Sequence, residues 1–129
     1  MSKNYYSCII THGKLAHCLK GISENLVVSA VKFEAYSNME LSLDDIEKKI
    51  QEDIKKKKPD KIVFFVDLSG GSSCWILAHR LKKGNNDVAV IAGVNVPLLV
   101  SYQMYVERLD WDDLLKKIVE DGKKGIITA

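Results

Sequence analysis

Short, nearly continuous apolar runs constrain the fold of this chain more than any other feature of its sequence. The runs YYSCIIT (5–11), KIVFFV (61–66) and VAVIAG (88–93) are apolar enough to be strands that are buried on both faces. Another run, LVVSAVKF (26–33), is rich in β-branched residues. It lies between the runs 5–11 and 61–66, so it predicts a strand that is the second along the chain. Strands of this kind are typical of a parallel sheet that helices cover on both sides.

Helix-like segments separate these runs. Apolar residues recur at helical spacing within them, and the polar stretch 36–42 is predicted to be a turn. The predicted helices are 15–22, 43–58 with Ser42 as its cap, 72–82, one with Pro97 in its first turn, and one that Asp110 caps and Gly122 ends. The alternation predicts the α/β class, a doubly wound and mainly parallel sheet with helices on both faces. Ile126 and Ile127 are apolar enough for one more short strand at the C-terminus.

Length, charge and cysteine spacing bound the class of protein. The 129 residues predict a single domain, 1–129, and a net charge of +2 gives no argument for nucleic acid or an anionic membrane. No apolar run approaches the ~18 residues that span a bilayer, and the first residues lack the apolar core of a signal peptide. Cys8, Cys18 and Cys74 are widely spaced, without the close pairs of a zinc site. We therefore expect a cytoplasmic protein with reduced thiols, no metal and no membrane insertion.

Polar residues follow three of the predicted strands at the point where each strand ends. The run 5–11 is followed by His12, the run 61–66 by Asp67, and the run 88–93 by Asn95 two residues on. In an open parallel sheet, ligands bind beyond the carboxyl ends of the strands. A histidine there is a candidate nucleophile, and an aspartate can fix its tautomer by accepting a hydrogen bond from one ring nitrogen.

The segment after Asp67 predicts an anion cradle at the start of a helix. Glycines let the backbone approach a ligand closely, serine hydroxyls add donors, and the first N–H groups of a helix favour a phosphate oxygen. No Walker lysine follows the glycines and no acid–base pair for hydrolysis is evident, which favours phosphoryl transfer onto and off the histidine itself. The predicted catalytic residues are His12 and Asp67, and the predicted phosphate-binding residues are Gly70, Gly71, Ser72 and Ser73.

Each of these features has a plainer interpretation. A histidine at a strand end is often a structural residue, and D-x-x-G-G-S is a common strand-to-helix turn. The segment GVNVP reads equally well as a strand exit in which proline begins a helix. A nucleotide-binding fold of the Rossmann type is disfavoured because no G-x-G-x-x-G follows the first strand. The argument for chemistry rests on the three features falling together at strand ends.

Three segments, IITHGKLA, FFVDLSGGSS and VIAGVNVPLLV, also resemble one known family in order and spacing. The sequence is similar to the enzyme IIA domain of the mannose family of the bacterial phosphoenolpyruvate-dependent sugar phosphotransferase system. The resemblance implies a doubly wound domain, often a homodimer that exchanges an antiparallel C-terminal edge strand. It implies that His12 accepts a phosphoryl group from the histidine-containing phosphocarrier protein and passes it to an enzyme IIB domain, with Asp67 as its partner and no cofactor.

The middle segment departs from the usual pattern of the family, which is Asp, two residues, then Gly-Gly-Ser-Pro-Phe. Leu68 stands where some members have threonine, and Ser69 where an aromatic residue is common. Ser73 replaces the proline, and Cys74 replaces the phenylalanine. These changes leave open which partners dock at the site. They also leave open an alternative function, a regulatory module of the same fold that phosphorylation controls without direct coupling to transport. The sequence does not identify the sugar.

Overall fold

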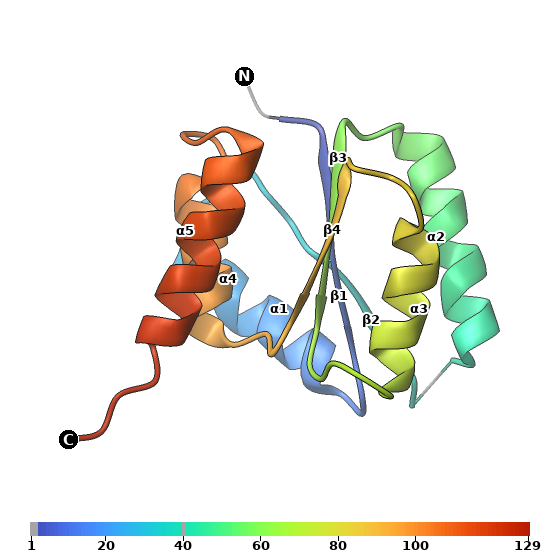
Figure 1. Cartoon of the computed structure of the whole chain (residues 1–129), viewed down its shortest axis with the longest axis horizontal. Helices are drawn as coiled ribbons and strands as arrows, with labels where there is room; N and C mark the ends of the chain where they lie inside the picture. Colours follow the sequence, from blue (N-terminus) through green and yellow to red (C-terminus); the bar gives the residue numbers. More distant parts are fainter. Residues whose placement is uncertain (1–2, 40) are drawn as a thin grey trace.

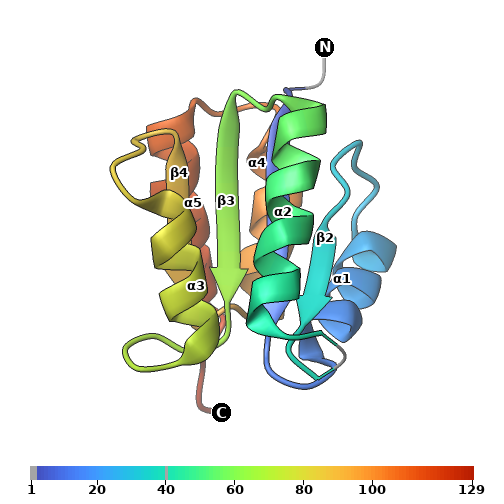
Figure 2. The same cartoon turned by 90° about the vertical axis from the view of Figure 1, so that its right-hand side faces the viewer.

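The computed structural model describes residues 3–39 and 41–129 as a three-layer α/β fold. Its four strands form one parallel sheet in the order β2-β1-β3-β4. Helices α2 and α3 cover one face, and α1, α4 and α5 cover the other (Figures 1 and 2). The elements are β1 (Tyr5–Thr11), α1 (Leu15–Leu26), β2 (Glu34–Ser37), α2 (Leu43–Lys57), β3 (Lys61–Val66), α3 (Ser73–Lys82), β4 (Val88–Ala92), α4 (Val96–Tyr105) and α5 (Trp111–Lys124).

The two central strands supply both halves of the core, as their apolar runs predict. Cys8 pairs with Phe64 across β1 and β3, and both lie in the cluster under α2 and α3. Their neighbours Ile9 and Phe65 also pair, and they lie in the opposite cluster under α1, α4 and α5. There Phe65 meets the ring of Tyr102 edge-on, with 5.3 Å between ring centroids. Because successive side chains of a strand point to opposite faces, a strand buried on both sides must be apolar throughout.

The predicted second strand, 26–33, is wrong. Helix α1 continues to Leu26, and the backbone N–H of Val27 still donates to Ser23 O at 3.3 Å. The strand lies at 34–37, and its last two residues fall in the stretch 36–42 that was predicted to be a turn. An edge strand pairs on one side only, so its sequence, EAYS, need not be apolar. Among the β-branched residues that suggested a strand, Val28 is fully exposed.

The end of the chain also differs from the prediction. Helix α5 runs to Lys124, and Gly122 lies inside it instead of ending it. A Cβ at Gly122 would meet the Leu98 Cβ at 3.0 Å, so this glycine permits close packing of α5 on α4. Residues 126–129 form neither helix nor strand, and they lead away from α5 (Figure 1). The exchanged C-terminal strand therefore stays a prediction.

No helix in the described part of the chain combines the length and apolar character that crossing a membrane requires.

Candidate active site

His12 and Asp67 meet at the carboxyl edge of the sheet, at the ends of the neighbouring strands β1 and β3. The ring Nδ1 of His12 lies 2.9 Å from Asp67 Oδ2. The backbone N–H of His12 donates to the same oxygen at 3.1 Å, and the backbone N–H of Leu68 donates to Asp67 Oδ1 at 3.0 Å. The predicted hydrogen bond between the two side chains is thus present. Each carboxylate oxygen of Asp67 also accepts from a backbone N–H, one after β1 and one after β3, and these bonds hold the carboxylate in place.

The environment keeps Asp67 ionised and the histidine ring accessible. Burial acts to raise the pKa of Asp67, but the backbone and ring N–H donors of His12 outweigh it, so the pKa lies below its usual value. An ionised carboxylate is an acceptor only, so the Nδ1 that it faces carries a proton, and in the neutral tautomer of the ring the lone pair of Nε2 is free. The His12 side chain is 41% exposed, against 14% for Asp67. The arrangement therefore presents one oriented, unprotonated ring nitrogen.

The loop that carries His12 is tied to the neighbouring strand end. Gly13 has a φ of +57°, a conformation that glycine adopts without strain. Its backbone N–H donates to Asn38 Oδ1 at 3.3 Å, and its carbonyl accepts from the hydroxyl of Ser37. On the other side, the buried Thr11 Oγ1 accepts from the N–H of Ala16 at 2.7 Å, in the first turn of α1. These contacts hold the backbone on either side of His12. Ser37 and Asn38 were not among the residues predicted for the site, because the second strand was predicted too early in the chain.

The predicted cradle connects Asp67 to the N-terminus of α3. Gly70 has a φ of +73°, whereas Gly71 does not need the left-handed conformation. Ser72 is the N-cap residue and Ser73 the first residue of α3. Within the described residues, the Ser72 hydroxyl is buried without a hydrogen-bond partner and makes no capping bond. A buried hydroxyl at a helix N-terminus, beside N–H groups that lack intrahelical partners, suits an anionic oxygen.

Cys74 is the further residue that the fold brings to this site. Ligating atoms of His12, Asp67 and Cys74 all lie within 4.8 Å of one another. The thiol belongs to the second residue of α3 and is fully buried. Burial, with a smaller contribution from the Asp67 carboxylate, raises the pKa of the Cys74 thiol to about 11. Cys74 was not predicted to belong to the site, because the spacing of the cysteines contains no metal motif.

Comparison with known protein families identifies the family to which the chain belongs. The model of the family EIIA-man, described as "PTS system fructose IIA component", matches residues 7–119. The chain belongs to this family. As an EIIA-man member it is a phosphotransfer component of the phosphotransferase system, and the resemblance drawn from its three motifs is confirmed. Comparison with curated proteins gave no match.

Solved structures share the fold of this EIIA-man chain at low sequence identity. A phosphotransferase system component EIIA from Streptococcus agalactiae is 18% identical, with a TM-score of 0.84 and 96% of each chain covered. A PTS IIA protein associated with the fucose utilization operon of Streptococcus pneumoniae is 17% identical, with a TM-score of 0.81, and the match covers 98% of this chain and 94% of the other. A mannose/sorbose specific IIA subunit from Enterococcus faecalis is 16% identical, with a TM-score of 0.78, covering 100% and 96%. The α/β fold predicted from the sequence is confirmed.

The third motif of the EIIA-man chain serves the scaffold of the site. Asn95 caps α4, where its Oδ1 accepts from the N–H of Leu98 at 2.9 Å, and its Nδ2 donates to Gly122 O at 3.1 Å. The backbone at the end of β4 reaches the site directly, because the N–H of Gly93 donates to the carbonyl of Asp67 at 3.1 Å. Asn95 thus holds α4 and α5 together at the end of β4.

The two other histidines lie on helix surfaces. His17 is an exposed residue of α1, and His79 is an exposed residue of α3 that packs on the ring of Trp75, with centroids 4.2 Å apart. Neither is at a strand end.

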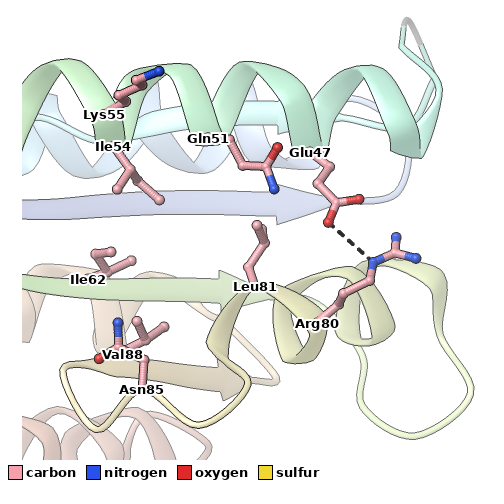
Figure 3. A pocket seen from close by; sticks show the side chains of 9 residues that line it. All are labelled: Glu47, Gln51, Ile54, Lys55, Ile62, Arg80, Leu81, Asn85 and Val88. Atoms are coloured by element: carbon pink, nitrogen blue, oxygen red, sulfur yellow. Dashed lines mark ion pairs between the residues drawn. The ribbon is translucent and has the colours of Figure 1, made fainter.

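A separate cleft lies between α2 and α3 (Figure 3). It reaches Ile62 and Val88, at the amino ends of β3 and β4, and Arg80 pairs with Glu47 across it at 3.3 Å. Aliphatic, basic, amide and carboxylate side chains line this cleft. Its described lining contains no histidine, cysteine or serine, and the candidate phosphoryl chemistry stays at the carboxyl edge.

Proposed function

We propose that this chain is a cytoplasmic phosphocarrier. His12 accepts a phosphoryl group from the histidine-containing phosphocarrier protein and passes it to an enzyme IIB domain during sugar uptake. Asp67 orients the ring, and Gly70, Gly71, Ser72 and Ser73 hold the phosphoryl oxygens. The observation that carries the proposal is the 2.9 Å contact of His12 Nδ1 with Asp67 Oδ2, which leaves Nε2 free and partly exposed at the carboxyl edge of the sheet.

The chemical step follows from that geometry. The lone pair of His12 Nε2 attacks phosphorus, a P–N bond forms, and the P–N bond of the donor phosphohistidine breaks with its electron pair returning to the donor ring. The His12 ring gains positive charge while Nδ1 keeps its proton, and the Asp67 carboxylate stabilises that charge through the hydrogen bond. Transfer to the acceptor reverses the same events. The free N–H groups at the start of α3 stabilise the phosphoryl oxygens without activating water.

Phosphorylation with purified components tests this proposal. The protein is incubated with phosphoenolpyruvate, enzyme I and the phosphocarrier protein, and the acid-labile phosphate that it takes up is measured by mass. His12→Ala should take up none, whereas His17→Ala and His79→Ala, which change exposed histidines of α1 and α3, should match the wild type. Undiminished uptake by His12→Ala would refute the proposal.

The dimer is the second part of the proposal. β4 is an edge strand of the described sheet, so one side of its backbone is open to pairing. The tail carries Ile126 and Ile127, which are 81% and 85% exposed in the single chain. Exchange of residues 126–129 between two copies would bury both side chains and satisfy both strand edges. The interfacial strand would run antiparallel to β4 of the partner.

A regulatory module remains a second candidate because of the altered middle motif. Leu68 is 60% exposed beside Asp67, where it changes the surface that a partner meets. Phosphate uptake followed by transfer to an enzyme IIB domain supports the transport role. Uptake without transfer to any IIB domain encoded near this gene would favour regulation.

A further inference from the structure

Three metal-ligating side chains from different elements converge at the carboxyl edge of the sheet. They are His12 after β1, Asp67 after β3 and Cys74 in the first turn of α3, and their ligating atoms lie within 4.8 Å of one another. We propose that His12, Asp67 and Cys74 form a binding site for a zinc ion, with solvent as the fourth ligand. Zinc binding at this site does not depend on the phosphocarrier function, although both use His12 and Asp67.

The distances fit a tetrahedral ion after small adjustments. Zinc bonds to nitrogen, oxygen and sulfur of about 2.0–2.3 Å place the ligand atoms of a tetrahedral site roughly 3.3–3.6 Å apart. The contact of His12 Nδ1 with Asp67 Oδ2, now 2.9 Å, would open slightly, and the thiol would approach by about 1 Å. The half-exposed ring of His12 is free to make most of this movement.

The chemistry of these three ligands indicates which metal the site would bind. A thiolate and an imidazole favour zinc and related transition metals, whereas magnesium and calcium favour oxygen ligands. The ion would enter from the side of His12, since the His12 side chain is 41% exposed whereas Cys74 is fully buried. Binding replaces the thiol proton, which leaves to the solvent, and the proton on His12 Nδ1, which the ring takes up again from solvent at Nε2. Three protein ligands and one open position match zinc sites that keep a water molecule.

Occupation of the site would have one consequence for function, and this consequence alone rests on the proposed phosphocarrier role. The ion would bind Asp67 Oδ2 and His12 Nδ1, the two atoms that are now joined by a hydrogen bond. It would therefore remove the orientation of His12 and compete with the incoming phosphoryl group. Zinc and phosphate uptake would exclude one another.

Cobalt(II) spectroscopy and zinc titration of the intact protein test the site without any phosphoryl transfer. Co²⁺ added to the wild type should give a thiolate-to-cobalt charge-transfer band and the strong visible absorption of a tetrahedral site. Cys74→Ser should lose the band, whereas Cys18→Ala, which removes the exposed thiol of α1, should keep it. A competing chelator should show zinc affinity weakened at least ~10-fold in Cys74→Ser.

A variant at a partly exposed position tests the site even if the buried variant Cys74→Ser misfolds. His12→Gln changes a side chain that is 41% exposed, and it should also weaken zinc binding at least ~10-fold in a protein that still unfolds cooperatively. Absence of the charge-transfer band in the wild type, or a band that survives in Cys74→Ser and disappears in Cys18→Ala, would overturn the proposal. Zinc affinity equal in the wild type and in both variants would do the same.

Discussion

Replacement of Asp67 by alanine should slow phosphorylation of His12 by about 10- to 150-fold. The change removes the acceptor of the 2.9 Å bond to the His12 ring. A hydrogen bond to a charged group contributes about 1.5–3 kcal/mol, and ~1.4 kcal/mol corresponds to a tenfold change in rate. The bond stabilises the positive charge that the ring gains during transfer, so its loss raises the barrier to that step. The label should still reach the same end point, because the nucleophile is intact.

Two comparison variants separate orientation from general loss of charge. Asp67→Asn keeps an acceptor oxygen but loses the charge and sets an amide N–H₂ against the backbone donors of His12 or Leu68, so it should also be slow. Asp87→Ala removes a carboxylate that pairs with Lys61 at the opposite end of the sheet, and its rate should equal that of the wild type.

The assay is initial phosphate uptake at fixed phosphocarrier concentration, with thermal unfolding measured on the same samples. Asp67 also accepts from two backbone N–H groups, so some loss of stability is expected in the alanine variant. An Asp67→Ala rate within twofold of the wild type, in a folded protein, would refute the role assigned to this carboxylate.

Three further predictions concern the backbone and the chain end. Gly70→Ala should destabilise the protein by about 1–2 kcal/mol because its φ is +73°, whereas Gly71→Ala, with open space at the Cβ and no positive φ, should not; equal unfolding free energies would contradict this. Gly122→Ala should destabilise by about 1–3 kcal/mol through its close contact with α4, whereas Gly21→Ala in α1, which meets nothing within 4 Å, should stabilise by up to ~1 kcal/mol. Deletion of 126–129, which spares α5, should lower the mass in light scattering from dimer to monomer; a wild type that is monomeric at micromolar concentration would rule the exchange out.

The central part of the fold could be predicted from the sequence because burial dictates its composition. β1 and β3 occupy the residue ranges that their apolar runs predict, and β4 ends one residue earlier. The edge strand β2 could not be found this way, since it is short, polar and paired only with β1. Gly122 resembles a helix stop in sequence, and only the packing of α5 against Leu98 reveals why a glycine lies inside the helix.

The candidate site was predictable to the extent that parallel strands bring their ends together. His12 and Asp67 follow adjacent strands, so their contact followed from the topology. Ser37 and Asn38 were hidden by the misplaced second strand. Cys74 was hidden because its neighbours at the site come from β1 and β3, 62 and 7 residues earlier in the chain. A correct position for the second strand would have pointed to Ser37 and Asn38 as residues of the same edge.

The position of phosphate on the histidine ring tests the central claim most directly. The protein is phosphorylated with phosphoenolpyruvate, enzyme I and the phosphocarrier protein, and ¹⁵N and ³¹P NMR then identify the phosphorylated nitrogen. Because Asp67 holds the proton on Nδ1, the account predicts phosphate on Nε2 of His12 and on no other histidine. Phosphate on Nδ1 of His12, or on His17 or His79, would contradict it.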